Sequence, residues 1–239
     1  MSMQVVILCG GQGTRAYPQT QRIPKALMEV GGIPIVEHVM GIYAAQGYDD
    51  FILACGYRKD DIVAHFQGHN HGWSIRCVDT GAESDTAERL FLLRGTLGPI
   101  FHVTYCDGLG DIDLRALVAY HRRHGGLVTV TAAALRSQYG LVYGEPDGRV
   151  VGFEEKPILP GYWINGGFFV FDRHVFDCWE GTNLEREMLP ALATGGQLHM
   201  YRHRGFWQSM DTYKDQQELN RLWPPYAAAF GPVPVEEAV

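Results

Sequence analysis

Glycines and cations gather just behind the first apolar run of the chain, where they could hold an anion. The stretch VVILCGGQGTRAYPQTQRIPKAL contains Gly10, Gly11 and Gly13, followed by Arg15 and Lys25. Glycine N–H groups can point at anionic oxygens without an intervening Cβ. Arginine can grip phosphate oxygens bidentately, and lysine adds a compact positive charge. The types and spacing of these residues therefore favour a triphosphate as the ligand over a tight turn with two solvated cations.

Two better-known phosphate loops do not fit this stretch. Gly11, Gly13 and Ala16 satisfy the dinucleotide pattern G-x-G-x-x-[GA], which requires a helix directly after the glycines. Pro18 and Pro24 would break that helix, and no acidic residue closes the second predicted strand to bind a ribose. The Walker pattern fails because no Gly-Lys-Ser/Thr follows. We therefore expect an extended glycine-rich loop.

Two aspartates far apart in sequence are candidates for cation binding. Asp107 follows an apolar run and precedes Gly108, so its carboxylate is expected at the carboxyl end of a strand, where α/β sheets bind ligands. Asp211 lies in QSMDT, ahead of a helical pattern. Turn formation by Asp107 and helix N-capping by Asp211 are the alternatives. Asp113 directly precedes a periodic segment and is interpreted as a helix cap.

The second half offers groups suited to hydroxyls and a second phosphate. FEEKP carries Glu155 and Lys156, although an exposed strand edge could show the same charges. In INGG, the Asn165 amide can both donate to and accept from a pair of hydroxyls. Between the third strand and the next helix, Ser84 and Thr86 could contact a base or its ribose, but a helix cap at Ser84 or Asp85 is an equal interpretation.

The elements that must position these residues read as an α/β domain. Apolar runs predict strands at 4–9, 50–55, 74–79 and 100–106, and helical spacing predicts helices over 34–46 and after Asp113. Later segments read as β at 127–135, 149–156 and 162–172, with helices at 184–193 and 212–223. This pattern predicts a Rossmann-like, mostly parallel sheet flanked by helices, with an extra β-rich portion. We expect one domain over 1–223 and a C-terminal tail at 224–239.

Composition narrows the class of protein. The chain of 239 residues has 46% hydrophobic residues and a net charge of −7, which argues against a nucleic-acid partner. No leader-like or membrane-spanning apolar stretch is evident, so a cytoplasmic protein without a membrane partner is expected. The five cysteines have no paired ligand spacing and are interpreted as buried, reduced thiols. His69 and His71 alternate on a polar loop, but no third ligand is evident beside them, so no metal site is predicted there.

The order of several motifs resembles the sugar-1-phosphate nucleotidyltransferases. After GGQGTRAYPQTQRIPKALMEVGG come YCDGLGDID, YGLV, FEEKP, INGGFFVFD and GFWQSMDT, and the resemblance runs from about residue 3 to residue 223. Members of this family join a nucleoside triphosphate to a sugar phosphate and release pyrophosphate. Within the family, CVDTG, SDTAERL and GFWQSMDT are most similar to glucose-1-phosphate cytidylyltransferases. The resemblance therefore implies CTP and glucose-1-phosphate as substrates and a homo-oligomeric enzyme.

The resemblance also implies roles for individual residues. It makes Arg15, Lys25 and Lys156 catalytic, with Lys156 on the sugar phosphate, and makes Asp107 and Asp211 the ligands of Mg²⁺. The implied nucleotide-binding residues are Leu8, Gly10, Gly11, Gly13, Thr14, Thr80, Gly81, Ser84 and Thr86. The implied sugar-binding residues are Tyr139, Gly140, Glu155, Lys156, Asn165 and Gly166.

Two departures from the family pattern stand out. Ala16 replaces the usual leucine, and only QGHNHGWSIR (67–76) connects AHF to CVDTG, where cytidylyltransferases have a longer excursion. The alternatives to cytidylyl transfer are the same chemistry with another nucleotide or sugar (thymidylyl, uridylyl or guanylyl transfer) and an inactive sugar-nucleotide-binding regulatory module. The intact set of cations and carboxylates speaks against the inactive module.

Overall fold

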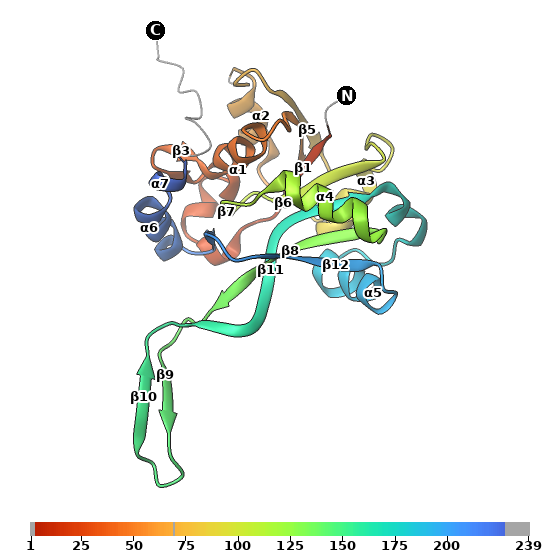
Figure 1. Cartoon of the computed structure of the whole chain (residues 1–239). Helices are drawn as coiled ribbons and strands as arrows, with labels where there is room; N and C mark the ends of the chain where they lie inside the picture. Colours follow the sequence, from red (N-terminus) through yellow and green to blue (C-terminus); the bar gives the residue numbers. More distant parts are fainter. Residues whose placement is uncertain (1–2, 69, 228–239) are drawn as a thin grey trace.

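A seven-stranded sheet forms the centre of the molecule (Figure 1). The computed structural model describes residues 3–68 and 70–227. The strands follow the order β12-β8-β11-β6-β1-β4-β5. Only β11 runs antiparallel to its neighbours. The predicted fold class, a mostly parallel sheet of Rossmann type, is confirmed. The bounds of these strands are β1 (Val5–Leu8), β4 (Asp50–Cys55), β5 (Ser74–Asp79), β6 (Ile100–Tyr105), β8 (Val128–Arg136), β11 (Ile158–Asp172) and β12 (Leu198–His203).

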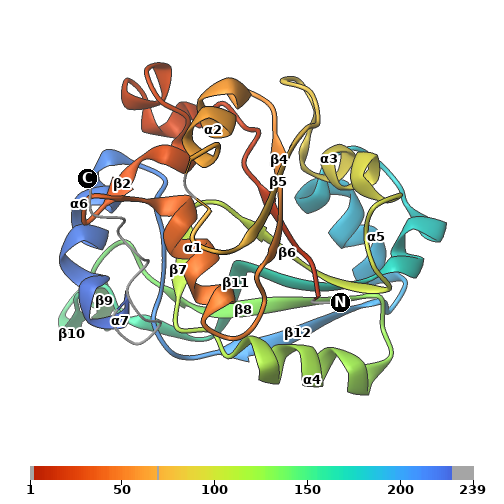
Figure 2. The ribbon, with the colours of Figure 1, turned by 90° about the horizontal axis from the view of Figure 1, so that it is seen from above.

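Helices cover both faces of the sheet, because successive side chains of a strand point to opposite sides. In β1, Val5 and Ile7 belong to one buried cluster, and Val6 and Leu8 belong to the other. Figure 2 shows α3 and α5 together, across the sheet from α1 and α6. The first cluster includes side chains of α1 (Ile35–Ala44), α2 (Lys59–Phe66), α4 (Leu114–His124) and α6 (Tyr213–Leu222). The second includes α3 (Thr86–Leu93), the π-helical turn η5 (Leu184–Met188) and α5 (Leu189–Thr194).

The order of the strands creates a crevice beside β1. From β1 the chain builds β4 and β5 outward on one side, then returns through α3 and adds β6 on the other side. The direction of strand addition reverses between β1 and β6. In open α/β sheets, ligands bind at such a reversal, outside the carboxyl ends of the strands. Leu8 ends β1 and Asp107 follows β6, so the sheet places both at this crevice.

The glycine-rich loop is folded into short turns, contrary to the extended loop expected from its prolines. Three single turns of 3-10 helix, η1 (Thr14–Ala16), η2 (Gln19–Gln21) and η3 (Lys25–Leu27), follow β1. Pro18 and Pro24 stand immediately before η2 and η3. Proline is tolerated at the start of a helical turn because no backbone N–H is needed there. The prolines therefore prevent one long helix from forming, and they also start two of the short turns.

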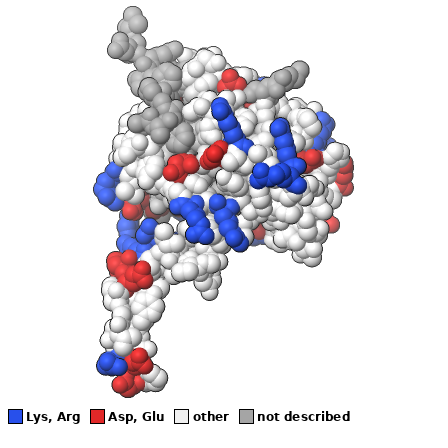
Figure 3. Space-filling view, viewed as in Figure 1, with Lys and Arg blue, Asp and Glu red and all other residues white. Residues whose placement is uncertain are grey.

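A hairpin of β9 (Leu141–Gly144) and β10 (Val150–Glu154) projects from the body of the molecule (Figure 1). Its exposed side chains include Val142, Val151 and Phe153. The hairpin carries charged groups at its base and tip, with uncharged surface between them (Figure 3). This hairpin is the part of the expected β-rich portion that lies outside the central sheet, because the segments expected at 127–135 and 162–172 join that sheet within β8 and β11.

The remaining elements are short. Two pairs of strands flank the sheet, β2 (Glu29–Val30) with β3 (Ile33–Pro34), and β7 (Gly108–Gly110) with β13 (Trp207–Ser209). A 3-10 segment, η4 (Arg173–Cys178), follows β11, and α7 (Pro224–Ala227) follows α6. The predicted tail thus begins as a helical turn, and residues 228–239 lie outside the described residues.

Two expectations from composition can be compared with the fold. Cys178 is exposed, unlike the buried Cys9, Cys55 and Cys106, so the expectation of buried thiols is wrong at this position. Among residues 3–68 and 70–227, every helix is too short or too polar to cross a bilayer.

Candidate active site

A cavity of about 480 Å³ opens at the carboxyl ends of β1 and β6. Of the residues predicted to act in catalysis or binding, the structure brings many to its walls. They are Leu8, Gly10, Gly11, Gly13, Arg15, Lys25, Ser84, Thr86, Asp107, Asn165, Gly166 and Asp211. The glycine loop, the two aspartates and the INGG segment therefore line one cavity, as the family resemblance implied.

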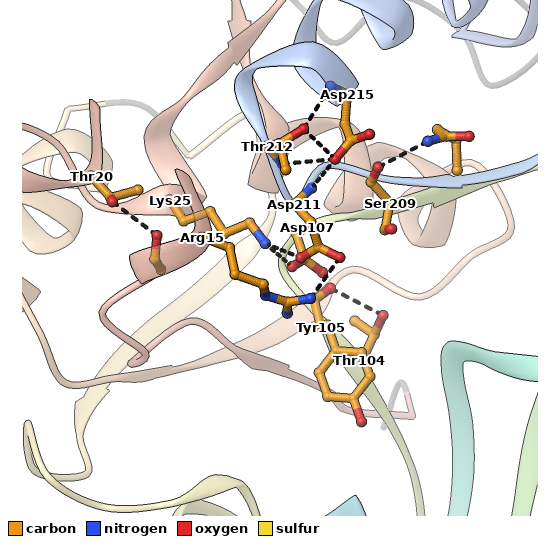
Figure 4. A network of polar contacts seen from close by, with 12 residues as sticks. Arg15, Thr20, Lys25, Thr104, Tyr105, Asp107, Ser209, Asp211, Thr212 and Asp215 are labelled. Atoms are coloured by element: carbon orange, nitrogen blue, oxygen red, sulfur yellow. Dashed lines mark hydrogen bonds and ion pairs between the residues drawn. The ribbon is translucent and has the colours of Figure 1, made fainter. Parts of the chain in front are cut away.

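Lys25 is at the centre of the charges in this cavity. Its Nζ lies 2.5 Å from Oδ2 of Asp107 and 2.8 Å from Oδ1 of Asp211. Arg15 contacts the other oxygen of Asp211, with Nη1 to Oδ2 at 3.0 Å. Figure 4 shows Lys25 between the two carboxylates, with Arg15 alongside. Both carboxylates thus converge on one cation, the ammonium group of Lys25.

Burial and charge act on Lys25 in opposite directions. Burial in the cavity wall lowers its pKa, but the neighbouring carboxylates of Asp107 and Asp211 raise it by a larger amount. The net effect raises the pKa above its ordinary value, so the ammonium stays charged at neutral pH. Arg15 differs from Lys25 in exposure, because 73% of its side chain is accessible, compared with 10% for Lys25. Arg15 is therefore the more solvent-accessible of the two cations.

The two aspartates are positioned by main-chain pairing and by a helix cap. Asp107 lies between β6 and β7, and its carbonyl accepts a hydrogen bond of 2.9 Å from Met210 N. Thr212 caps α6 in a capping box with Asp215. The Asp215 carboxylate also accepts from Asp211 N at 3.0 Å. The N-cap that Asp211 was considered for is thus filled by its neighbour, which leaves the Asp211 side chain available to the cavity.

Arg89 supports the glycine loop from beneath, a role that the sequence did not reveal. Its guanidinium donates to the carbonyls of Gly10 (3.0 Å), Cys55 (3.2 Å) and Gly81 (2.7 Å). It also donates to the hydroxyl of Thr80 at 2.7 Å. Burial lowers the pKa of Arg89, but an arginine remains protonated in proteins. A Cβ at Gly10 would overlap this guanidinium, so glycine is required there for close packing.

The opposite wall of the cavity is a polar network around Tyr105. The Tyr105 hydroxyl is bonded to the carboxylate of Glu185 and accepts from Asn165 Nδ2 at 3.2 Å. Glu185 also accepts from the Thr86 hydroxyl at 2.8 Å. Burial, and then the charge of Glu185, raise the pKa of Tyr105, which keeps the hydroxyl protonated. Trp207 Nε1 fixes the backbone of this wall by donating to Gly166 O at 2.7 Å.

Several sequence-predicted residues do not line the cavity. Thr80 is buried and its hydroxyl donates to Cys55 O at 2.7 Å, while the Gly81 carbonyl is bonded to Arg89. Thr14 lies in η1, outside the cavity wall. Tyr139, Gly140, Glu155 and Lys156 lie beside the strands of the projecting hairpin, away from the cavity. Their predicted part in sugar binding therefore requires a different position of the hairpin.

The cavity residues for which the sequence predicted no role include Arg89, Tyr105, Glu185 and Trp207. Trp207 lies within the motif GFWQSMDT, and Arg89 lies within SDTAERL. Membership of these motifs was the one signal in the sequence that could have pointed to them. Tyr105 precedes Cys106 in YCDGLGDID. Glu185 lies in the π-helical turn η5, and no motif indicated it.

The cavity lies at the strand reversal of a Rossmann-like sheet and contains a glycine loop, two cations and two carboxylates. This combination is typical of α/β proteins that bind the phosphates of nucleotides. The chain belongs to the nucleotidyl transferase family, whose model matches residues 4–216. It is therefore an enzyme of nucleotidyl transfer.

Individual relatives differ in the nucleotide that their names specify. The chain is 39% identical to a Bacillus subtilis (strain 168) protein named "Probable glucose-1-phosphate cytidylyltransferase", over 92% of this chain and 96% of the relative. It is 34% identical to a mannose-1-phosphate guanyltransferase of Aspergillus fumigatus, over 89% of this chain and 62% of the relative. The crystal structure of HddC from Yersinia pseudotuberculosis has the same fold, with a TM-score of 0.72, 18% identity, and coverage of 92% and 99%.

Proposed function

We propose that the chain is a sugar-1-phosphate cytidylyltransferase that converts CTP and glucose-1-phosphate to CDP-glucose and pyrophosphate. The observation that carries this proposal is the convergence of Lys25, Asp107 and Asp211 on one point beside the glycine loop. The similarity to a relative named as a cytidylyltransferase supports the choice of base.

The reaction requires alignment and charge neutralisation more than proton transfer. A phosphate monoester has a second pKa of about 6, so a sugar-1-phosphate is largely dianionic near neutral pH and needs no general base. Its oxygen attacks the α-phosphorus of the triphosphate in line with the leaving pyrophosphate. Lys25, Arg15 and the N–H groups of the glycine loop hold the triphosphate and neutralise the charge that develops. This assignment is consistent with a site in which the cations and glycines lie on one wall.

The donor set suits a magnesium ion. Two carboxylates already converge on a cation, since Lys25 Nζ contacts both Asp107 and Asp211. Mg²⁺ is commonly held by one or two carboxylates together with substrate phosphate oxygens and water. Asp107 and Asp211 would hold the ion, and Lys25 would turn from these carboxylates to the phosphates. When bound, the ion would neutralise charge on the phosphate oxygens.

The sugar side of the site is formed by the Tyr105 network. Asn165 lies where its amide can meet a hydroxyl pair, and Gly166 lets a flat ligand approach the backbone. Glu155 and Lys156 would reach the sugar phosphate through movement of the hairpin. The short connection 67–76 takes no part in base recognition in this proposal, because none of its described residues lines the cavity.

The decisive experiment is a matrix of nucleoside triphosphates against sugar-1-phosphates, followed by pyrophosphate release. We expect the highest kcat/KM for CTP with glucose-1-phosphate. UTP is the stringent comparison, because a pocket that bonds the exocyclic amine of cytosine rejects a base without it by about 10⁴-fold. Preference for GTP with mannose-1-phosphate would instead agree with the guanyltransferase relative. Release of no pyrophosphate with any pair would indicate a binding module without catalysis.

A further inference from the structure

Two arginines lie over one indole ring beside the substrate cavity. The Cζ atoms of Arg202 and Arg204 lie 5.6 Å and 5.3 Å from the centre of the Trp163 ring. Contacts of this kind between a guanidinium and an aromatic ring are favourable. We call these three residues the arginine–tryptophan ledge. None of them lines the cavity, and the proposed nucleotidyl transfer gives them no role.

The pairing of the strands makes the ledge a continuation of the cavity wall. Strands β11, β8 and β12 lie next to one another at one side of the sheet (Figure 1). Asn165 of β11 pairs with Ala132 of β8, which pairs in turn with Arg202 of β12. Paired residues point to the same face of a sheet, and neighbouring strands are about 4.8 Å apart. The Cα of Arg202 is therefore roughly 10 Å from that of Asn165. Trp163 is two residues from Asn165 along β11 and shares its face.

The ledge also lies at the edge of the sheet where the cavity opens. Strand β8 runs parallel to β12 and antiparallel to β11, and β11 runs antiparallel to β6. The carboxyl ends of β8 and β12 therefore lie at the same edge as that of β6. Arg202 is the last residue but one of β12, and Arg204 follows the strand. Ala134 of β8 pairs with Trp163, and its small side chain leaves room for the arginines to reach the indole.

The two positive charges of the ledge have no carboxylate partner. Among residues 3–68 and 70–227, no Asp or Glu forms an ion pair with Arg202 or Arg204. Both arginines are exposed. Two like charges held at one ring repel each other, and a bound anion offsets that repulsion. Arginine can stack on an aromatic ring while its planar N–H groups bind a phosphate or a carboxylate. The ledge is therefore suited to an anionic group.

The order of the strands indicates which end of a substrate reaches the ledge. Asp107 follows β6, which lies on one side of β11, whereas Arg202 belongs to β12 on the other side. Asn165 in β11 lies between them, where its amide can bind sugar hydroxyls. A sugar held there with its 1-phosphate toward Asp107 turns its opposite end toward β12 and the ledge.

We propose that the ledge binds an anionic group at the end of the sugar remote from C1. The acceptor substrates then include sugar 1-phosphates that carry a second phosphate or a carboxylate at that end. This inference rests on the proposed function and extends its class of substrate. The chemistry is unchanged, because an oxygen of the 1-phosphate bonds to the α-phosphorus and the bond from that phosphorus to pyrophosphate breaks. With CTP, glucose 1,6-bisphosphate gives CDP-glucose 6-phosphate and pyrophosphate, and the second phosphate is not altered.

Calorimetry of the whole chain tests the ledge without relying on turnover. Glucose-1-phosphate, glucose 1,6-bisphosphate and glucuronic acid 1-phosphate are each titrated with Mg²⁺, in the presence and in the absence of α,β-methylene-CTP, which cannot release pyrophosphate. At least one of the two probes with a second anion should bind about tenfold or more tightly than glucose-1-phosphate. Comparison of these two probes identifies whether the ledge prefers phosphate or carboxylate. Binding of both probes no tighter than that of glucose-1-phosphate would overturn the proposal.

Two variants and a matched control locate the gain in affinity. Arg202→Gln and Arg204→Gln change exposed side chains and should fold. Each is expected to weaken binding of the tighter probe by about tenfold, and that of glucose-1-phosphate by much less. Arg123→Gln is the control, because it removes the same charge from an arginine that lies 6.0 Å from the centre of the Tyr120 ring. Arg123 belongs to α4, which packs on the other face of the sheet.

The outcomes separate this inference from the proposed function. Equal losses for the probe and for glucose-1-phosphate, or no loss in either ledge variant, would show that the second anion does not bind at the ledge. Pyrophosphate release from CTP and glucose-1-phosphate by the unmodified chain is measured separately and tests only the proposed function. A chain that released no pyrophosphate would still report the ledge through calorimetry.

Discussion

Lys25 and Asp211 are separated by 186 residues in the sequence, and their side chains meet at 2.8 Å in the cavity. Asp107 completes the contact from the end of β6. The cation loop, the middle strand and the C-terminal segment thus each contribute one charge to the same point. Because the three charges depend on one another, substitutions among them are expected to act as a unit.

The first prediction concerns the two carboxylates. Asp107→Asn and Asp211→Asn should each lower kcat by about 10² or more while leaving the far-ultraviolet circular dichroism unchanged. The double variant should be much less than additively worse, since both groups serve one ion. EDTA should silence the unmodified enzyme, and Mg²⁺ should restore it. Full turnover in EDTA would remove the metal from the proposed mechanism.

The second prediction separates the two cations of the loop. Lys25→Met and Arg15→Met should both raise the KM for triphosphate, since a charge-assisted contact contributes about 1.5–3 kcal/mol, or about 10- to 150-fold. Lys25→Met should have the larger effect on kcat, because Lys25 is buried between the carboxylates whereas Arg15 is largely exposed. Lys214→Met, in α6, serves as the control for lost charge. A larger effect on the KM for the sugar phosphate would contradict this assignment.

The third prediction compares two adjacent glycines. Gly10→Ala should lower the free energy of unfolding by about 1–3 kcal/mol, because its Cβ would overlap the Arg89 guanidinium. Gly11→Ala is the matched control, since nothing lies within 4 Å of a Cβ there, and its change should stay within about 0.5 kcal/mol. Urea unfolding of the ligand-free chains measures both. Equal stabilities would mean that Arg89 moves aside without loss of its hydrogen bonds.

The fourth prediction concerns the projecting hairpin. If it moves toward the cavity when the sugar phosphate binds, Lys156→Ala should raise the KM for that substrate and leave the KM for triphosphate almost unchanged. Arg149→Ala, in the loop that joins β9 to β10, controls for charge elsewhere on the hairpin. Steady-state kinetics with each substrate varied in turn gives both constants. If Lys156→Ala raised only the KM for triphosphate, Lys156 would belong to the triphosphate side of the site instead of the sugar-phosphate side.

The fifth prediction is a loss of stability on acidification. Burial lowers the pKa of His102 to about 3, and burial followed by the charge of His124 lowers that of His121 to about 4. Both histidines are neutral in the folded chain and gain protons on unfolding below about pH 6.5. The free energy of unfolding should therefore fall as the pH drops from about 7 to 5, with a limiting slope of about 1.4 kcal/mol per pH unit for each group.

A pair of variants attributes this slope. His102→Leu should flatten the pH dependence measured by urea unfolding, because it removes one titrating group. Val103→Ala changes the buried neighbour of His102 in β6 without removing a titrating group, and should leave the slope unchanged. An identical slope in the unmodified chain and in His102→Leu would refute the assignment to His102.

Much of the sheet and of the charged site could be predicted because strand ends leave a strong local pattern. The apolar run before Asp107 placed that carboxylate at the crevice, and the aspartate ahead of a periodic segment placed the cap of α4 at Asp113, whose side chain accepts from Ala116 N. Asp211 was ambiguous between cap and ligand, since both roles precede a helix. The hydroxyl of Thr212 caps α6. Asp211 and Thr212 both precede the helix and both have side chains that can cap it, so the sequence pattern did not distinguish between them.

The rest of the site depends on partners that leave no trace in sequence. Three of the four acceptors of Arg89 are main-chain carbonyls, and every residue has one. Glu185 reaches Tyr105 across 80 residues through a π-helical turn. The direction of the hairpin follows from the path of β11 out of the sheet, which periodicity cannot specify. Local patterns therefore predicted the positions of strand ends, but not these long-range polar contacts.

The capping box of α6 also bears on how the protein is made. Asp211 leaves the ribosome after all seven strands of the central sheet, because β12 ends at His203. A nascent chain that ends at His203 contains all seven strand segments of the central sheet, Lys25 and Asp107, but lacks Asp211. Synthesis that stops there yields a product without one of the two carboxylates that the proposed mechanism requires. In the proposed mechanism, catalytic competence is thus acquired only after Asp211 has been added and Thr212 and Asp215 close the first turn of α6.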